Sequence, residues 1–194
     1  IHPISIDLKL PDDGEIDIFL VQWHTPLPVR GNHPIKIDVH VAGTKRMVLE
    51  RLRDFLLNGM IPQTQMPPAF IIMPELSLPF NQIALLEGLL NRLNRPMVIV
   101  AGVEYMTWDE YVTEVRALPD MPNPDSWLAG GANNQFVNAA VILLREEGGR
   151  VRKYLQPKLH PEDHEQALPI FFGRSVFVFQ SAERQSGVRV NFCV

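Results

Sequence analysis

Apolar residues recur along the chain with two different periods, and together these periods predict a layered α/β protein. Residues 45–58 and 80–94 carry apolar side chains at helical spacing, with Thr44 as the N-cap and Gly59 as the end of the first helix. Short apolar or alternating runs predict core strands at 16–23, 69–73, 96–102 and 136–144. The order of strand, helix, strand, helix, strand that results is typical of helices packed on a sheet.

The second half of the chain adds paired strands. The runs 136–144 and 150–155 are separated by residues 146–149, whose sequence Glu-Glu-Gly-Gly predicts a hairpin turn. Residues 175–180 and 188–193 predict a final pair of strands with a polar turn between them. The sheet of the predicted α/β fold should therefore contain antiparallel as well as parallel neighbours.

Three segments have weaker patterns. Residues 1–14 fit an N-terminal extension or linker, and residues 35–41 fit either an added strand or an extended entry to the first helix. Residues 104–134 are rich in Pro, Asp, Asn and Gly, and they interrupt the rhythm of strands and helices. We therefore expect a long loop or insertion there, carrying a short helix, and we expect its aromatic residues to serve a lid or an association surface instead of the core: Trp108, Tyr111 and Trp127.

Composition and charge narrow the class of protein. The chain has 194 residues, 46% of them hydrophobic and 21% charged, which fits a single globular domain over residues 1–194. The net charge of −4 gives no electrostatic reason to expect nucleic-acid binding. The sequence has no apolar run of transmembrane length and no signal-peptide pattern, and its one cysteine excludes an intramolecular disulfide framework. A cytoplasmic protein is the simplest expectation.

Two residues stand at the ends of predicted strands, where side chains can face a cleft. Cys193, the only cysteine, comes where the alternating run 188–193 stops. Glu75 follows the run 69–73 and a proline, so its carboxylate should emerge at the carboxyl end of a strand, where open α/β sheets carry their sites. The alternatives are a buried cysteine that acts as a small hydrophobe, and a loop glutamate that faces water.

A third group of candidates follows the predicted hairpin. Lys158 and Glu165 lie seven residues apart in a segment dense in ionisable groups, for which a solvated charge cluster is the alternative. A metal site of His160, Asp163 and His164 is a further alternative. The proline between the two histidines argues against it, because their spacing would need a regular helix.

A strand-end glutamate, a lysine and a strand-end cysteine together make a chemically sensible nucleophile set. The thiolate is the reactive form of cysteine, and it forms when a base or a cation lies beside the thiol. A carboxylate can take the thiol proton and later activate water. An ammonium group can stabilise the oxyanion that develops when the thiolate attacks the carbon of a C–N bond.

Three motifs in this order resemble the carbon–nitrogen hydrolase (nitrilase) superfamily. They are IIMPELSLP around the glutamate, PKLHPEDHE around the lysine and GVRVNFCV around the cysteine, and weaker similarity extends through PMVIVAGVEY and FVNAAVILLREEGGRVRKY. The resemblance implies an α-β-β-α sandwich. Because the chain begins at Ile1 and stops at Val194, directly after the cysteine motif, we expect the sandwich to be incomplete at its C-terminal end and the native polypeptide to continue.

The resemblance also implies a role for each matched residue. Glu75 would be the general base, Lys158 the cation that stabilises the oxyanion, and Cys193 the nucleophile. Glu165 matches the second glutamate found in many members, which positions the lysine or the substrate. Lys153 is a rival for the lysine role, but the sequence that follows Lys158 fits the motif better.

The function implied is hydrolysis of a small-molecule amide or nitrile through a cysteine thioester. No cofactor or metal is required, because nucleophile, base and oxyanion donor are all side chains. By resemblance, we expect a homo-oligomer or a fused domain, with no nucleic acid bound by this domain and no membrane partner. Two alternatives stay open: a nitrilase-like binding or regulatory module, and acyl transfer to an amine by the same triad.

Overall fold

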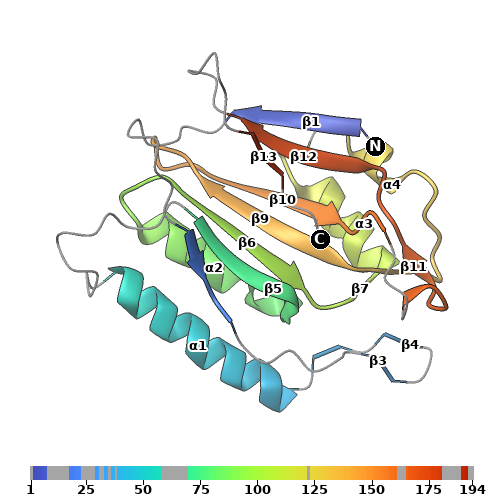
Figure 1. Ribbon diagram of the computed structural model, residues 1–194, viewed down its shortest axis with the longest axis horizontal. Helices are drawn as coiled ribbons and strands as arrows, with labels where there is room; N and C mark the ends of the chain where they lie inside the picture. The colour runs from blue at the N-terminus through green and yellow to red at the C-terminus, as the bar shows by residue number, and fades with distance from the viewer. Residues whose placement is uncertain are drawn as a thin grey trace.

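A mixed sheet of five strands forms the centre of the fold. The computed structural model describes residues 2–7, 18–22, 29–30, 33–34, 36–37, 39–57, 70–121, 123–160, 165–180 and 189–191. The five strands are β2 (Ile18–Leu20), β5 (Phe70–Leu78), β6 (Met97–Val103), β9 (Ala139–Arg145) and β10 (Val151–Pro157). Their order across the sheet is β10–β9–β6–β5–β2 (Figure 1), with β2, β5 and β6 parallel and β9 antiparallel to both of its neighbours.

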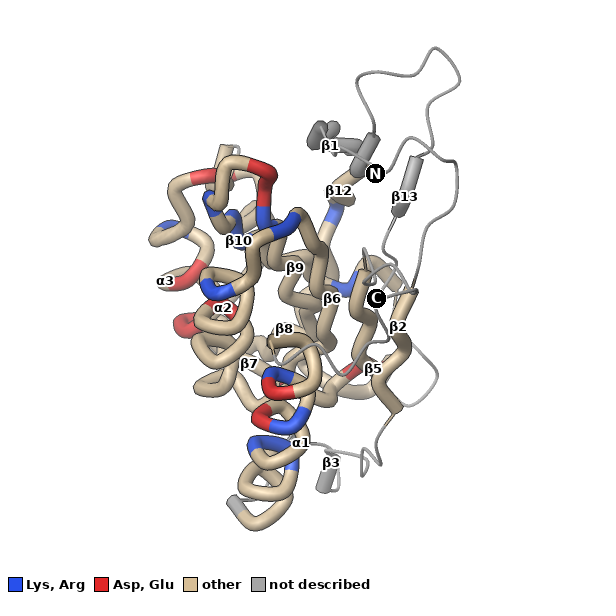
Figure 2. Tube along the Cα trace, turned by 90° about the vertical axis from the view of Figure 1, so that its left-hand side faces the viewer, with Lys and Arg blue, Asp and Glu red and all other residues tan. Residues whose placement is uncertain are grey.

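The longer helices cover one face of this sheet, whereas strands and the short helix that carries Trp127 lie against the other. The helices are α1 (Val39–Leu57), the short 3₁₀ helix η1 (Phe80–Gln82), α2 (Ile83–Arg92), α3 (Trp108–Ala117) and α4 (Pro124–Leu128). Figure 2 shows α1, α2 and α3 on the same side of the sheet. On the opposite side, the Phe177 ring lies 4.9 Å from the Tyr154 ring of β10 and 4.4 Å from the Trp127 ring. The predicted α/β class is confirmed.

Three smaller sheets complete the described part of the chain. The strands β1 (His2–Asp7), β12 (Ser175–Gln180) and β13 (Arg189–Asn191) form a sheet in which β1 is parallel and β13 antiparallel to β12. The strands β7 (Met106–Thr107), β8 (Phe136–Val137) and β11 (Ile170–Phe171) form a second sheet, with β8 in the middle. The strands β3 (Val29–Arg30) and β4 (His33–Pro34) pair with each other.

The apolar runs of the sequence become the buried centre of the sheet. Every residue of β6 and of β9 is buried, as expected for strands that are covered on both faces. The predicted hairpin between β9 and β10 is confirmed, because the Glu146 amide donates to the Arg150 carbonyl at 2.9 Å and Gly149 adopts a φ of +87°. Each described helix is too short or too polar to cross a membrane.

The start of the first helix differs from the prediction. Helix α1 begins at Val39, so it takes in the end of the alternating run 35–41, and Thr44 lies inside the helix with its hydroxyl bonded to the His40 carbonyl at 3.2 Å. Tertiary structure reaches the added first turn, since the buried Gln82 side chain donates to the Ala42 carbonyl at 2.7 Å. Gly59, the expected end of the helix, lies outside the described residues.

The expectation that the aromatic residues of segment 104–134 serve a lid or an association surface is wrong. The described part of this segment contains β7, α3 and α4, and Trp108, Tyr111 and Trp127 are 6%, 0% and 2% exposed. Helix α3 begins with a capping box, in which the Thr107 hydroxyl accepts from the Glu110 amide and the Glu110 carboxylate accepts from the Thr107 amide. The prolines and glycines therefore separate short elements whose aromatic side chains pack into the core.

A buried lysine and glutamate connect α1 to the ends of β5 and β6. Glu104, 7% exposed, accepts from the Phe80 amide at 2.8 Å and from the Ile37 amide at 2.7 Å. Lys45, 3% exposed, donates from α1 to the Ser77 carbonyl of β5. Burial lowers the pKa of Lys45 from 10.5 to about 8, although the negative charge of Glu104 acts to raise it.

The lowered pKa of Lys45 should make stability rise with pH in a defined window. Below pH 8 both the folded and the unfolded chain carry the charge, and between about 8 and 10.5 only the unfolded chain still binds that proton. The unfolding free energy should therefore increase across this window, by up to about 3 kcal/mol from this group. Urea unfolding of wild type and Lys45→Met at several pH values isolates the contribution. A difference between the two proteins that stays constant with pH would contradict it.

Candidate active site

Four segments of the main sheet bring functional side chains to one edge. Strands β5, β6 and β10 point the same way and β9 points the opposite way, so the carboxyl ends of three strands meet the start of the fourth. Glu75 lies in β5, Tyr105 follows β6, Asn138 precedes β9 and Lys158 follows β10. The Lys158 amide donates to the Asn138 carbonyl at 2.8 Å, which extends the pairing of β10 with β9 by one bond.

Lys158 lies between two carboxylates. Its ammonium is 2.7 Å from Glu75 Oε1 and 2.9 Å from Glu165 Oε2. The lysine and Glu165 side chains are 4% and 0% exposed, whereas the Glu75 side chain is 35% exposed. Burial alone would lower the pKa of Lys158, but the bonds to Glu75 and Glu165 outweigh it and raise the pKa to about 12. The lysine is therefore a fixed cation at neutral pH.

Two further side chains hold the carboxylates. The Asn138 amide nitrogen donates to Glu75 Oε1 at 2.6 Å and to Glu165 Oε1 at 3.0 Å. The Tyr105 hydroxyl donates to the same oxygen of Glu165 at 3.0 Å. Glu165 is thus bonded through both of its oxygens. Among the described residues, nothing bonds to Oε2 of Glu75.

The backbone around Glu75 is strained and closely packed. Leu76, the next residue, has a φ of +50°, which is uncommon for a residue with a side chain. The pairing of β5 with β6 shifts register between Met73 and Leu78. Gly102 of β6 permits this approach, because a Cβ at that position would lie 2.4 Å from the Glu75 Cα. Regular pairing of β5 with β6 stops at Met73, directly before Pro74, and resumes at Leu78, while the strand itself continues past the proline.

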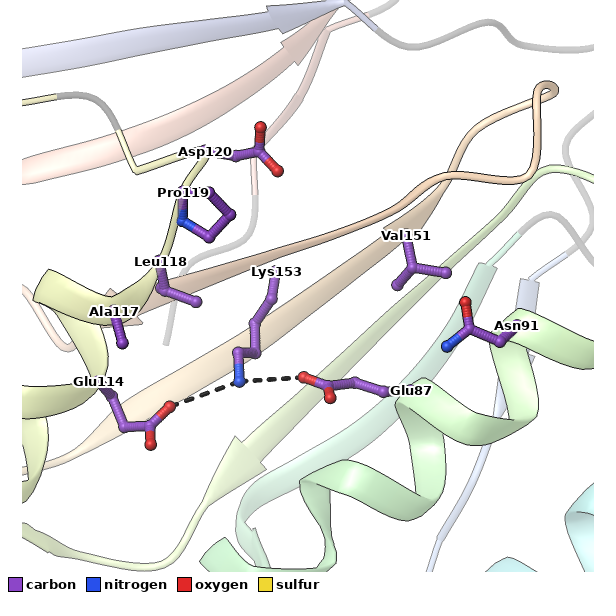
Figure 3. Close-up of a pocket in the computed structure, with 9 residues that line it drawn as sticks. All are labelled: Glu87, Asn91, Glu114, Ala117, Leu118, Pro119, Asp120, Val151 and Lys153. Atoms are coloured by element: carbon purple, nitrogen blue, oxygen red, sulfur yellow. Dashed lines mark hydrogen bonds and ion pairs between the residues drawn. The ribbon is translucent and has the colours of Figure 1, made fainter.

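Lys153, the alternative candidate for the catalytic lysine, lies outside the site formed by Glu75, Lys158 and Glu165. Lys153 lies under the helices, where its ammonium is 3.0 Å from Glu87 of α2 and 3.4 Å from Glu114 of α3 (Figure 3). It lines an open surface pocket of about 330 Å³, and its side chain is 25% exposed. Lys158 follows β10 directly and extends its pairing by one bond, and it lies five positions after Lys153, an odd separation that directs the two side chains to opposite sides of the sheet.

The structure brings together three of the four predicted site residues: Glu75, Lys158 and Glu165. Cys193 lies outside the described residues, two positions after the end of β13. Of the alternative metal ligands only His160 is described, and it is exposed. Within the described part of the chain, no group of three or more His, Cys, Asp or Glu side chains is arranged to hold a metal ion.

The sequence reasoning missed Asn138 and Tyr105. Asn138 is a polar residue inside the apolar run FVNAAVILL, and a buried polar residue in such a run needs partners, so this was a usable signal. Tyr105 gave no comparable signal, because a tyrosine after a buried strand is equally consistent with packing. Both are buried, at 0% and 1% exposure.

Replacing the Tyr105 hydroxyl should destabilise the protein, whereas the same change at Tyr111 should not. Tyr105→Phe removes a hydrogen bond to a buried carboxylate, which we expect to cost about 1.5–3 kcal/mol. Tyr111 is equally buried, but its hydroxyl has no hydrogen-bond partner in the described part of the structure, so Tyr111→Phe should be neutral or stabilising. Denaturant unfolding of both variants tests this, and equal losses would show that the Glu165 contact contributes nothing.

Comparison with known proteins does not assign a family. Neither protein-family models nor curated proteins match the sequence. Among solved structures, the chain is similar to an N-terminal amidase with a Gln-Gly peptide and to an N-terminal amidase with an Asn-Glu peptide, each at 12% identity and a TM-score of 0.42. Each alignment covers 77% of this chain and 35% of the amidase chain. At this similarity the likeness decides neither the family nor the activity.

Proposed function

We propose that this chain is a nitrilase-like domain that hydrolyses a non-peptide amide or nitrile through a thioester on Cys193. The observation that carries the proposal is the position of Lys158, held between Glu75 and Glu165 with almost no contact with water. These residues come from two of the three motifs that resemble the carbon–nitrogen hydrolases. In this proposal residues 1–194 belong to one domain, and the sheet of β1, β12 and β13 is part of the second sheet of an α-β-β-α sandwich.

The contacts of the cluster support different roles for its two carboxylates. Glu165 is fully buried and bonded through both oxygens, so it is suited to hold Lys158 in place. Glu75 is partly exposed, and its Oε2 is uncommitted within the described residues, so it is suited to exchange protons with a bound reactant. Lys158 keeps its proton at neutral pH, and it is therefore suited to stabilise an oxyanion by charge.

For an amide substrate, these roles give a balanced reaction. Glu75 takes the proton of the Cys193 thiol while the sulfur attacks the carbonyl carbon, and Lys158 stabilises the negative oxygen of the tetrahedral intermediate. The C–N bond then breaks, the amine leaves with the proton from Glu75, and an acyl thioester remains. Glu75 next takes a proton from water, whose oxygen attacks the thioester. The carboxylic acid leaves, and the proton returns to the thiol.

Mass spectrometry of the intact protein tests the proposal, because Cys193 is the only cysteine in the sequence. Incubation with a panel of small amides and nitriles should give an acyl adduct that is absent from Cys193→Ala. Glu75→Gln should lower kcat about 10²–10⁴-fold. It should also lower the rate at which Cys193 is alkylated during a short exposure to an alkylating reagent near neutral pH. Added amines that capture the acyl group would indicate transfer in place of hydrolysis. Two results together would refute the catalytic role and favour a binding module. Wild type and Glu75→Gln would both be alkylated at the rate of an unstructured cysteine peptide, and wild type would form no acyl adduct.

A further inference from the structure

We propose that Asn138 is a positioning residue, whose side-chain amide fixes Glu75 and Glu165 around Lys158 and thereby determines which oxygen of Glu75 can exchange a proton. This inference rests on the proposed function for its catalytic consequence, but its geometric basis is independent. Asn138 lies where the chain passes from β8 in a small sheet to β9 in the main sheet. Its backbone is therefore held by a strand on each side.

The four side chains form a closed ring of two donors and two carboxylates. Lys158 donates to Glu75 Oε1 and Glu165 Oε2, and Asn138 donates to Glu75 Oε1 and Glu165 Oε1. Both bonds to Glu75 end on the same oxygen, which leaves Oε2 as the atom that faces a reactant. With the lysine alone, the Glu75 carboxyl group could rotate and exchange its oxygens. The second donor opposes that rotation, because two hydrogen bonds must then break before the oxygens can exchange.

A neutral amide is the side chain that suits this position electrostatically. Two carboxylates already share one ammonium that is itself only 4% exposed, so a third carboxylate would add repulsion. A second cation would satisfy the carboxylates but would also bind Glu75 more tightly and hinder its protonation. The amide supplies two N–H donors without adding charge.

The other end of the Asn138 side chain argues against a purely structural role. Asn138 is 0% exposed, and its Oδ1 is buried without a hydrogen-bond partner in the described part of the structure. An unsatisfied buried acceptor costs stability, and a residue kept for packing alone would avoid it. The two carboxylates fix the direction of the amide, because they repel an oxygen and attract the NH₂ group.

Gln156 provides a matched control within β10. It is 1% exposed, and its amide nitrogen donates to the Ser175 and Pro157 carbonyls at 2.8 and 2.9 Å. Its oxygen accepts from the Phe177 amide at 3.0 Å. All three partners are backbone groups, so Gln156 is a buried amide whose contacts serve the fold.

The first test compares kinetic constants of Asn138→Leu, Asn138→Asp and Gln156→Leu in the intact protein. Loss of the supporting donor should lower kcat about 10–100-fold at unchanged KM in Asn138→Leu, as for other residues that hold a reacting group. Asn138→Asp keeps the shape but replaces the donor by a carboxylate, so its kcat should fall further. Gln156→Leu should lower the melting temperature and leave kcat within about twofold below that temperature. Wild-type kcat in Asn138→Leu would overturn the inference.

The second test needs no turnover and so separates this inference from the proposed function. The side-chain ¹H and ¹⁵N amide signals of Asn138, assigned with Asn138→Leu, should shift in Glu75→Gln and again in Glu165→Gln, while those of Gln156 stay in place. Asn138 signals that respond to neither variant would overturn the positioning role even in an active enzyme. A wild-type protein that acts on no amide or nitrile, but shows both shifts, would overturn the proposed function and leave the positioning role of Asn138 established.

Discussion

Lys158→Met should destabilise the protein by about 3–5 kcal/mol, the usual cost of removing one partner of a buried ion pair. The variant leaves the fully buried Glu165 carboxylate and the nearby Glu75 carboxylate without their shared cation. The raised pKa of Lys158, about 12 in the folded chain against an ordinary value of 10.5, reports only part of this stabilisation, and that part is fully present below pH 10.5 and is lost as pH rises through 12. Urea unfolding near pH 7 measures the effect at full size.

Lys153→Met is the matched control, because Lys153 also bridges two glutamates but is 25% exposed. Partly exposed ion pairs contribute little, so we expect a loss of about 1 kcal/mol or less. A second variant makes the test sharper. Glu165→Gln should destabilise wild type, yet it should stabilise Lys158→Met, since it removes the uncompensated buried charge. If the losses of unfolding free energy from Lys158→Met and Glu165→Gln simply add in the double variant, the proposed electrostatic role of Lys158 is contradicted.

Gly102→Ala should be strongly destabilising, although it adds only one methyl group to the main sheet. The added Cβ would lie 2.4 Å from the Glu75 Cα, 2.6 Å from the Pro74 carbonyl oxygen and 2.7 Å from the Leu76 nitrogen. All three are backbone atoms, so the strand that carries Glu75 must move. Overpacking of this kind costs about 1–3 kcal/mol or more. Turnover should fall as well, because Glu75 would leave the contact with Lys158.

Gly88→Ala controls for the change from glycine to alanine. Gly88 lies inside α2, and no described heavy atom approaches within 4 Å of the position of its added Cβ. Alanine favours a helix over glycine by about 1 kcal/mol, so this variant should gain stability. Thermal unfolding and turnover of the two alanine variants are compared with wild type. A Gly102→Ala protein as stable and active as Gly88→Ala would disprove the close approach of β6 to Glu75.

The local patterns of the sequence determined the elements and their burial. Continuous apolar runs predicted the buried strands β6 and β9, and a turn of two glutamates and two glycines predicted the hairpin that follows β9. These predictions succeeded because the period of apolar residues and the φ preference of glycine act within a few residues of the chain. The sequence motifs around Glu75 and around Lys158 likewise predicted three of the residues that meet at the sheet edge. These are Glu75, Lys158 and Glu165.

The tertiary structure decided what local patterns do not encode. Prolines and glycines in residues 104–134 predicted a lid, but Trp127 and its aromatic neighbours are buried because distant rings such as Phe177 complete their environment. The antiparallel pairing of β9 with β6 and β10 brings Asn138 to the same sheet edge as the strand ends that carry Glu75 and Lys158. Such convergence depends on which strands pair, on their register and on the face each residue takes. These are long-range packing choices, and a short stretch of sequence does not fix them.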